Sequence, residues 1–169
     1  MRSETTNSSE SELPGQPRHS TENPQGQGAS RDQGRHAVVG ILYEDRHFLV
    51  IRRSQFVRAP GLICFPGGGI EPGEDLHTAV KRELMEELNL AVEVCGHLWT
   101  SQTRWGTKLE WLVCQRPDGH EPSANPQEVE EVLWMTPQML LDRDDLLGSM
   151  PEFLDNFLGG HFDEYFDRT

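Results

Sequence analysis

The chain has few cysteines, and their spacing is uninformative. Its 169 residues contain Cys64, Cys95 and Cys114 and no Cys-X-X-Cys pair. An odd number of cysteines argues against a disulfide framework. We therefore expect a protein of a reducing compartment, with a cytoplasmic location.

Long apolar runs and positive charge are also lacking. No apolar window is long enough to span a membrane or to form the core of a secretory signal, so we expect no membrane partner. Lys and Arg number 15 against 28 Asp and Glu, which gives a net charge of −13. This balance disfavours a protein that tracks a polyanionic backbone, so we expect no nucleic-acid polymer as partner. A small phosphate ligand is still compatible with this negative charge if metal ions bridge the protein and the phosphate.

Apolar side chains are almost missing from residues 1–35, where only Met1, Leu13 and Ala29 occur. This polar stretch cannot bury enough surface to offset its ordering entropy, so it is predicted to be a disordered tail. Its five acidic residues argue against a transit peptide. Residues 36–169 then form one domain, which is long enough for a real core.

The domain shows strand and helix patterns in alternation. A turn candidate at 44–46 predicts that the first two strands form a hairpin, and Trp105–Thr107 suggests a second hairpin. Strands and a central helix with more helix at the end predict an α/β or α+β sandwich. The predicted strands cover 37–43, 47–53, 61–65, 91–102, 107–115 and 129–135, and the predicted helices cover 75–88, 137–141 and 150–158.

Three glutamates lie against the apolar side of the helix predicted over 75–88. Glu83 and Glu87 fall in or beside the apolar arc, and Glu86 lies next to it. Like charges at this spacing repel, and partial burial makes each ionised form more costly. A divalent cation resolves both problems, and hard oxygen ligands suit Mg²⁺ or Mn²⁺. A solvated acidic face is the ordinary alternative for such a cluster. The apolar arc consists of Leu76, Val80, Leu84 and Leu88.

A glycine-rich loop precedes this helix at fixed spacing, and the combination resembles the Nudix box. Only one position departs from the family's pattern, since Asn89 stands where the family has Gly. Asn also accepts a positive φ, so the turn can still form. The matching positions are Gly68, Glu74, Arg82, Glu83, Leu84, Glu86, Glu87 and Leu90.

This resemblance implies an α/β/α sandwich with a mixed sheet and a hydrolase that attacks a phosphorus with water. Glu83, Glu86 and Glu87 would hold Mg²⁺, or Mn²⁺, together with the carbonyl of Gly67. Arg82 would orient these glutamates, acting with them in catalysis. Glu74 would have a structural role in the loop–helix unit, as Asn89 would at the end of the helix.

Further residues are assigned by comparison with MutT-type members. Glu128 is the favoured distal carboxylate, acting in catalysis at the start of a strand, with Glu130 and Glu131 as alternatives. Arg53 resembles their phosphate-contacting Arg, although Arg52 is its neighbour and only one of the two can point inward. The predicted substrate-binding residues are Arg53, Phe65, Gly68 and Arg104. Phe65 is equally compatible with a core position.

The leading hypothesis is a Mg²⁺-dependent pyrophosphohydrolase acting on a small nucleotide, with a (deoxy)nucleoside triphosphate giving monophosphate and pyrophosphate. Hydrolysis of ADP-ribose or a nucleotide sugar is the second reading, and a non-catalytic nucleotide-binding sensor is the third. Diphosphate isomerisation would need a catalytic Cys, and Cys64 is instead interpreted as buried structure. We expect a monomer or a homodimer.

Overall fold

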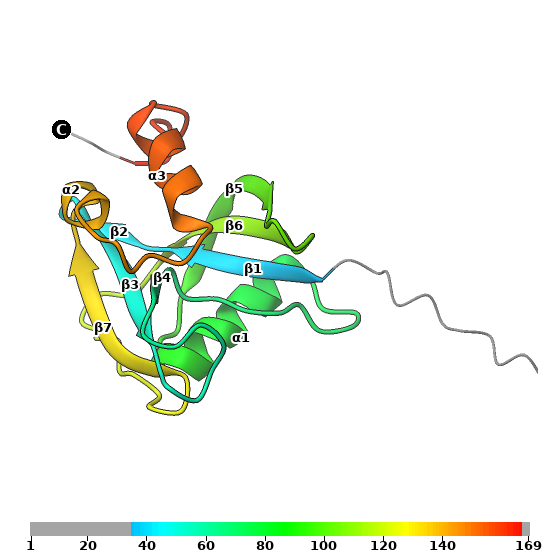
Figure 1. The fold of residues 1–169 in the computed structure, drawn as a ribbon. Helices are drawn as coiled ribbons and strands as arrows, with labels where there is room; N and C mark the ends of the chain where they lie inside the picture. The colour runs from blue at the N-terminus through cyan, green and yellow to red at the C-terminus, as the bar shows by residue number, and fades with distance from the viewer. Residues whose placement is uncertain (1–34, 167–169) are drawn as a thin grey trace, which may run out of the picture. The chain divides into compact units, whose positions relative to one another are not determined.

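The computed structural model describes residues 35–166, and Figure 1 shows their arrangement. The chain divides into Met1–Asp32 and Gln33–Thr169, and the first unit lies outside the described residues. The predicted tail over 1–35 therefore stays a prediction. No helix among the described residues is long and apolar enough to cross a membrane. The elements are β1 (His36–Ile41), β2 (Tyr43–Glu44), β3 (His47–Arg53), β4 (Ile63–Cys64), α1 (Leu76–Leu88), β5 (Glu93–Gln102), β6 (Lys108–Gln115), β7 (Val129–Met135), α2 (Pro137–Leu141) and α3 (Met150–Leu158).

The strands form two sheets. In the first, β6 lies between β1, which is parallel to it, and β5, which is antiparallel. In the second, β3 pairs with β7 on one edge and with β2 and β4 on the other, all antiparallel. The predicted mixed-sheet α/β sandwich is therefore confirmed.

The first predicted hairpin is wrong in part. The strand expected over 37–43 is broken at Leu42, so that β1 pairs with β6 and only the short β2 pairs with β3. The turn lies at Asp45 and Arg46, which both have positive φ. Leu42 is fully buried, which explains why the apolar run continues through the break. The other predicted strands and helices are present, but the strand predicted over 61–65 is only the two-residue β4 and the strand predicted over 91–102 begins at Glu93.

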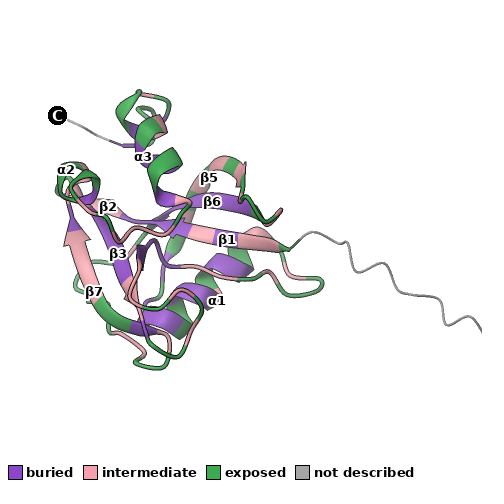
Figure 2. Cartoon of the chain, viewed as in Figure 1, coloured by how far each residue is buried: buried purple, intermediate pink, exposed green. Residues whose placement is uncertain are grey.

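Two helices cover opposite faces of the first sheet. Alternate residues of a strand point to opposite faces, and in β6 Leu109 and Trp111 pack in the cluster that contains α3, whereas Leu112 packs in the cluster that contains α1. Figure 2 shows α1 with a buried side toward the strands and an exposed outer side. The sheet thus separates a largely aromatic core under α3 from an aliphatic core under α1.

A buried carboxylate ties the three strands of the first sheet together. Glu110 of β6 is 4% exposed and accepts hydrogen bonds from Thr100 Oγ1 (2.6 Å) and Lys108 Nζ (2.5 Å). Its two oxygens also lie 2.9 Å from Nε2 of His36 and 2.7 Å from Nε2 of His97. Burial raises the pKa of Glu110, but these hydrogen bonds outweigh it and hold the pKa well below its usual range. The ionised carboxylate is therefore a cross-link between β1, β5 and β6.

Candidate active site

The glycine-rich loop is fastened along the free edge of β1. Val38 N–H donates to Gly68 O and Gly40 N–H donates to Pro66 O, both at 2.9 Å, and Ile70 N–H donates to His36 O at 3.0 Å. β1 also pairs with β6 on its other edge. The loop therefore extends the sheet, which fixes its backbone relative to the helix that follows.

Two adjacent glycines are required for different reasons. Gly67 has a φ of 145°, and a Cβ there would overlap the carbonyl oxygen of Val38. Gly68 has no positive φ, but a Cβ there would lie 2.5 Å from Oε2 of Glu83. Gly67 lets the loop lie close to β1. The absence of a side chain at Gly68 leaves the space that the Glu83 carboxylate occupies.

Both ends of α1 are capped as the sequence predicts. The carboxylate of Asp75 accepts hydrogen bonds from the backbone N–H groups of His77 and Thr78, which satisfies free donors at the start of the helix. Asn89 has φ 48° and ψ 37°, and its N–H donates to the last helical turn. Asn89 thus makes the left-handed turn in place of glycine.

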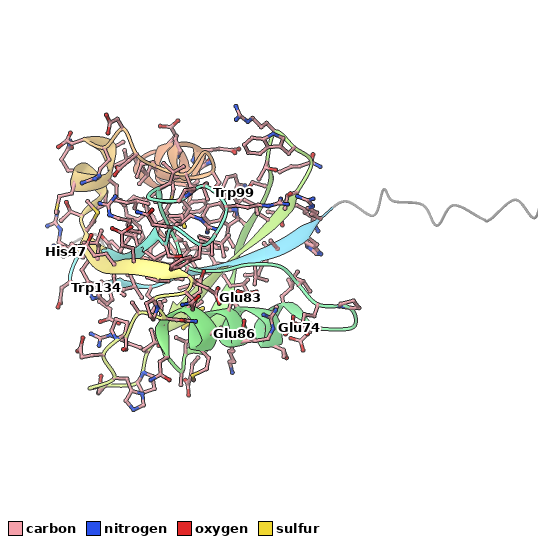
Figure 3. All side chains as sticks on the ribbon, turned by 60° about the horizontal axis from the view of Figure 1, so that its bottom comes forward. His47, Glu74, Glu83, Glu86, Trp99 and Trp134 are labelled. Atoms are coloured by element: carbon pink, nitrogen blue, oxygen red, sulfur yellow. The ribbon has the colours of Figure 1, made fainter. Side chains whose placement is uncertain are left out.

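The three glutamates of α1 differ in burial. Glu83 is 8% exposed and Glu87 is 4% exposed, whereas the side chain of Glu86 is 49% exposed. The expectation that all three lie against the packed side is therefore wrong for Glu86, because it lies about 100° further round the helix than Glu87. In Figure 3, Glu83 lies between the helix and the strands.

Arg82 binds the acidic groups of the loop and the helix together. Its Nε and Nη2 donate to the two oxygens of Glu74, each at 2.9 Å, and Nη2 also donates to Gly69 O at 2.8 Å. Nη1 donates to Glu83 Oε1 at 2.9 Å and to Glu86 Oε2 at 3.2 Å. Such bidentate, charge-assisted pairs fix orientation as well as adding attraction. Arg82 and Glu74 therefore hold the loop, Glu83 and Glu86 in one unit.

The buried glutamates have raised pKa values. Burial raises the pKa of Glu87 to about 8, although the Gly67 N–H donates to its Oε2 at 2.9 Å and opposes the rise. Burial also raises the pKa of Glu83, against the opposing effect of Arg82. The negative charge of Glu128 adds to both shifts. A cation placed here would favour the ionised form of each group.

The carboxylates of the described residues do not lie in an arrangement that could coordinate one metal ion. Within residues 35–166, no three His, Cys, Asp or Glu side chains are arranged so that they could hold a metal ion. Arg82 occupies oxygens of Glu83 and Glu86, and Glu87 faces the Gly67 N–H. The donor chemistry nevertheless fits a hard divalent cation, because carboxylate oxygens are its preferred ligands and buried Glu83 and Glu87 supply them.

Among the three distal glutamates, Glu128 is the one whose charge acts on the helix. It precedes β7 and is half-buried, whereas Glu130 and Glu131 are exposed. Glu131 instead accepts a hydrogen bond from Arg52 Nε at 3.3 Å. Glu128 is therefore close enough for its charge to raise the pKa of both Glu83 and Glu87, whereas its two neighbours point to solvent.

The structure distinguishes Arg53 from Arg52. Arg52 donates to Asp145 Oδ2 at 3.0 Å and to Gly61 O at 2.9 Å, and its bonds go to none of the glutamates of α1. Arg53 lines the cavity beside the loop, donates to Arg58 O at 2.7 Å, and its charge opposes the rise in the pKa of Glu87. The pairing of β3 with β7 shifts register between the two arginines. This bulge accompanies the different directions that the two side chains take.

A cavity of about 690 Å³ extends from the glycine loop to the start of α3. Gly67, Gly68 and Arg53 line one part of it, and Leu109 and Trp111 line another. The lining combines charged, polar and apolar side chains, which suits a ligand with a charged part and an apolar part. Its remaining lining residues include Phe65, Arg104, Trp105, Leu147, Gly148, Ser149, Met150 and Glu152.

Phe65 and Arg104 both line this cavity but differ in setting. Phe65 is 4% exposed, and its ring centre lies 4.8 Å from that of Phe153, so it is also a core residue. The Arg104 guanidinium lies 4.0 Å from the ring centre of Trp105, which is exposed at the tip of the β5–β6 hairpin. The segment Leu147–Met150 also lines the cavity, and sequence reasoning missed it because it lacks any motif.

Comparison with known proteins gives the family. The NUDIX domain family model matches residues 34–157, so the chain belongs to the Nudix family. The RNA pyrophosphohydrolase of Novosphingobium aromaticivorans is 33% identical over 104 residues, which cover 46% of this chain and 62% of that protein. The CTP pyrophosphohydrolase of Escherichia coli is 26% identical over 104 residues, covering 62% of this chain and 77% of that protein.

Solved structures agree on the fold. The crystal structure of a MutT NUDIX hydrolase from Burkholderia pseudomallei has a TM-score of 0.62 at 24% identity, covering 73% of this chain and 98% of that one. The chain spans less than two thirds of the length of the RNA pyrophosphohydrolases that it matches. The chain therefore has the Nudix fold as well as the Nudix sequence.

Proposed function

We propose that the protein is a divalent-cation-dependent hydrolase that cleaves a pyrophosphate bond in a small nucleoside diphosphate-linked substrate. The best single candidate is a (deoxy)nucleoside triphosphate, giving monophosphate and pyrophosphate. The observation that supports this proposal most directly is that the buried Glu83 and Glu87 lie beside a glycine loop that also lines a cavity. The family's curated relatives include pyrophosphohydrolases, which supports this class of reaction.

The chain's own residues divide the binding task. Arg53 is a cation at the loop end of the cavity and would bind phosphate oxygens. The apolar lining from Phe65, Leu109 and Trp111 would bind the nucleoside, with Arg104 and Trp105 at the hairpin tip. A pyrophosphate bound by Arg53 then lies next to Gly67 and Gly68, where the loop meets the glutamates.

The glutamates would hold the cation. Glu83, Glu86 and Glu87, with the Gly67 carbonyl, supply oxygen ligands of the kind that Mg²⁺ and Mn²⁺ prefer. When bound, the cation neutralises phosphate charge, orients the pyrophosphate and lowers the pKa of an attacking water. Arg82 and Glu74 hold these ligands in place, and Glu128 would accept a proton from the attacking water or complete the ligand set.

A substrate panel tests this proposal. The panel contains the nucleoside and deoxynucleoside triphosphates, an oxidised dNTP, ADP-ribose, nucleotide sugars, dinucleoside polyphosphates and a 5′-triphosphorylated RNA, each with Mg²⁺, Mn²⁺ or EDTA. Chromatography of the products identifies the bond that is cleaved. We expect cleavage that requires the metal and falls by at least about 100-fold in Glu83→Gln and Glu87→Gln.

The control is Glu93→Gln, which removes one negative charge from an exposed position on β5. It should retain full activity. Unchanged turnover in both helix variants would overturn the proposed site, and nucleotide binding without turnover of any substrate would favour a sensor module. A cytoplasmic location and a monomeric or homodimeric state remain predictions from the sequence.

A further inference from the structure

The loop before β7 is joined to the carboxyl end of the glutamate helix. Ser123 N–H donates to Leu88 O at 2.7 Å, and Asn125 N–H donates to Glu87 O at 2.8 Å. The last carbonyls of a helix have no partner within the helix, so these bonds satisfy groups that are otherwise free. The loop is therefore aligned on the turn of α1 that carries Glu86 and Glu87.

Asn125 is the centre of this junction because several of its polar groups are engaged. Its side-chain Nδ2 donates to Glu86 O at 3.1 Å, and its Oδ1 accepts from Gln127 N–H at 3.2 Å. Its carbonyl oxygen accepts from the N–H groups of Glu128 (2.9 Å) and Val129 (2.7 Å). One side chain thus connects the backbone of Glu86 with the turn that leads to Glu128.

Glu128 is fixed from the opposite side by Ser54, which is 3% exposed. Ser54 N–H donates to Glu128 O at 2.9 Å, and Ser54 Oγ donates to Gln127 O at 2.7 Å. The backbone N–H and C=O of Glu128 are therefore both bonded. Pro126 adds stiffness, since a proline restricts both its own φ and the conformation of the residue before it.

We propose that Asn125 is a positioning residue, which acts through Glu128 by setting the place of its carboxylate relative to Glu83 and Glu87. This inference rests on the proposed function. Glu128 lies on a loop, and without a connection to α1 its distance from the helix would vary with every movement of that loop. Two backbone bonds, from the N–H groups of Ser123 and Asn125, already join the loop to the helix. The Asn125 side chain fixes this connection in one orientation through one donor bond to Glu86 O and one acceptor bond from Gln127 N–H.

A double-mutant cycle with Glu128→Gln separates positioning from a general structural role. Asn125→Ala should lower kcat by about tenfold or more while leaving KM within about twofold, because Asn125 does not line the cavity proposed for the nucleoside. In the Glu128→Gln background, the same substitution should lower kcat by no more than about twofold, since the group it positions is already gone. Gln127→Ala, which changes an exposed side chain in the same loop, is the matched control and should be fully active.

Asn125→Ser separates the effects of the two side-chain bonds. It is also the variant to use if Asn125→Ala fails to fold. Serine keeps an acceptor for Gln127 N–H but cannot reach Glu86 O, so its kcat should fall between wild type and Asn125→Ala. Three outcomes would each overturn the positioning role. They are a normal kcat in the folded Asn125 variants, losses that multiply with those of Glu128→Gln, and a wild-type kcat in Glu128→Gln itself. These outcomes are read in an active wild type, whereas failure of the proposed function shows as unchanged turnover in Glu83→Gln and Glu87→Gln or as no turnover at all.

Discussion

Adding one methyl group at Gly68 should disable the site without removing any of its functional groups. An alanine Cβ there would lie 2.5 Å from Glu83 Oε2 and 2.6 Å from both its Cδ and its Oε1. Real Cβ contacts stay above 3.0 Å, so the carboxylate must move by at least about half an ångström. Gly68 has no positive φ, so alanine adds this contact without adding backbone strain.

The size of the effect follows from what holds Glu83. Its carboxylate is bonded to Arg82 at 2.9 Å and is 8% exposed, so it has little room for retreat. Displacing a group at a reaction centre by about 1 Å can lower the rate by about 100-fold. We expect kcat to fall between about tenfold and 100-fold, with a loss of about 1–3 kcal/mol in the free energy of unfolding from the crowding.

The assay measures kcat on the substrate from the panel, with Mg²⁺ titrated in each variant. Gly69→Ala is the control, because a Cβ at Gly69 would meet none of the described atoms within 4 Å and its φ is not positive. Gly69→Ala should therefore match wild type in rate and in stability. Equal rates for the two alanine variants would refute the argument that Gly68 leaves space for the working position of Glu83.

Three other predictions concern stability and are measured by urea unfolding. In EDTA, Glu87→Gln should be inactive but more stable than wild type by about 3 kcal/mol near pH 8. Burial raises the pKa of Glu87 to about 8, so the folded protein favours the protonated carboxyl group. This contribution to the stability of wild type is therefore fully present below about pH 4 and is lost as the pH rises through 8, whereas glutamine stays neutral. A smaller advantage at pH 8 than at pH 5 would contradict this. Glu110→Gln should cost about 2–3 kcal/mol at pH 7. Since the pKa of Glu110 is lowered, this cost should shrink as the pH falls below about 4, and a cost independent of pH would reject the ionic cross-link. Asn89→Ala should lose about 1 kcal/mol and Asn89→Gly less than about 0.5 kcal/mol, and equal losses would show that the positive φ of 48° is not the cause.

Local sequence signals were sufficient for most elements. The caps at Asp75 and Asn89 and the alternating strands depend on neighbouring residues, so they can be predicted without tertiary structure. The break at Leu42 cannot be predicted in this way, because β1 leaves the expected hairpin to pair with β6, which begins some 70 residues later. Non-local pairing of this kind leaves no trace in a local pattern.

The site follows the same division. The spacing of the loop and the helix predicts that Glu83 and Glu87 lie at one place, and the structure buries both. The strand period shows that Arg52 and Arg53 point to opposite sides, but it does not show which of the two lines the cavity, because that depends on how β3 packs in the folded chain. Asn125 was missed because its contacts join two distant segments and its type is common in any turn.

The hydrogen bonds between the glycine loop and β1 separate a part of the molecule that is fixed to the sheet from a part made of connecting segments. The loop and α1 are joined to the sheet through the bonds of Val38, Gly40 and Ile70. A change in the loop or in α1 therefore disturbs the aliphatic core between α1 and the sheet. The far walls of the cavity come instead from the tip of the β5–β6 hairpin and from Leu147–Met150. In evolutionary terms, such connecting segments can be lengthened or replaced without disturbing the loop and the helix, so one frame can accept different ligands.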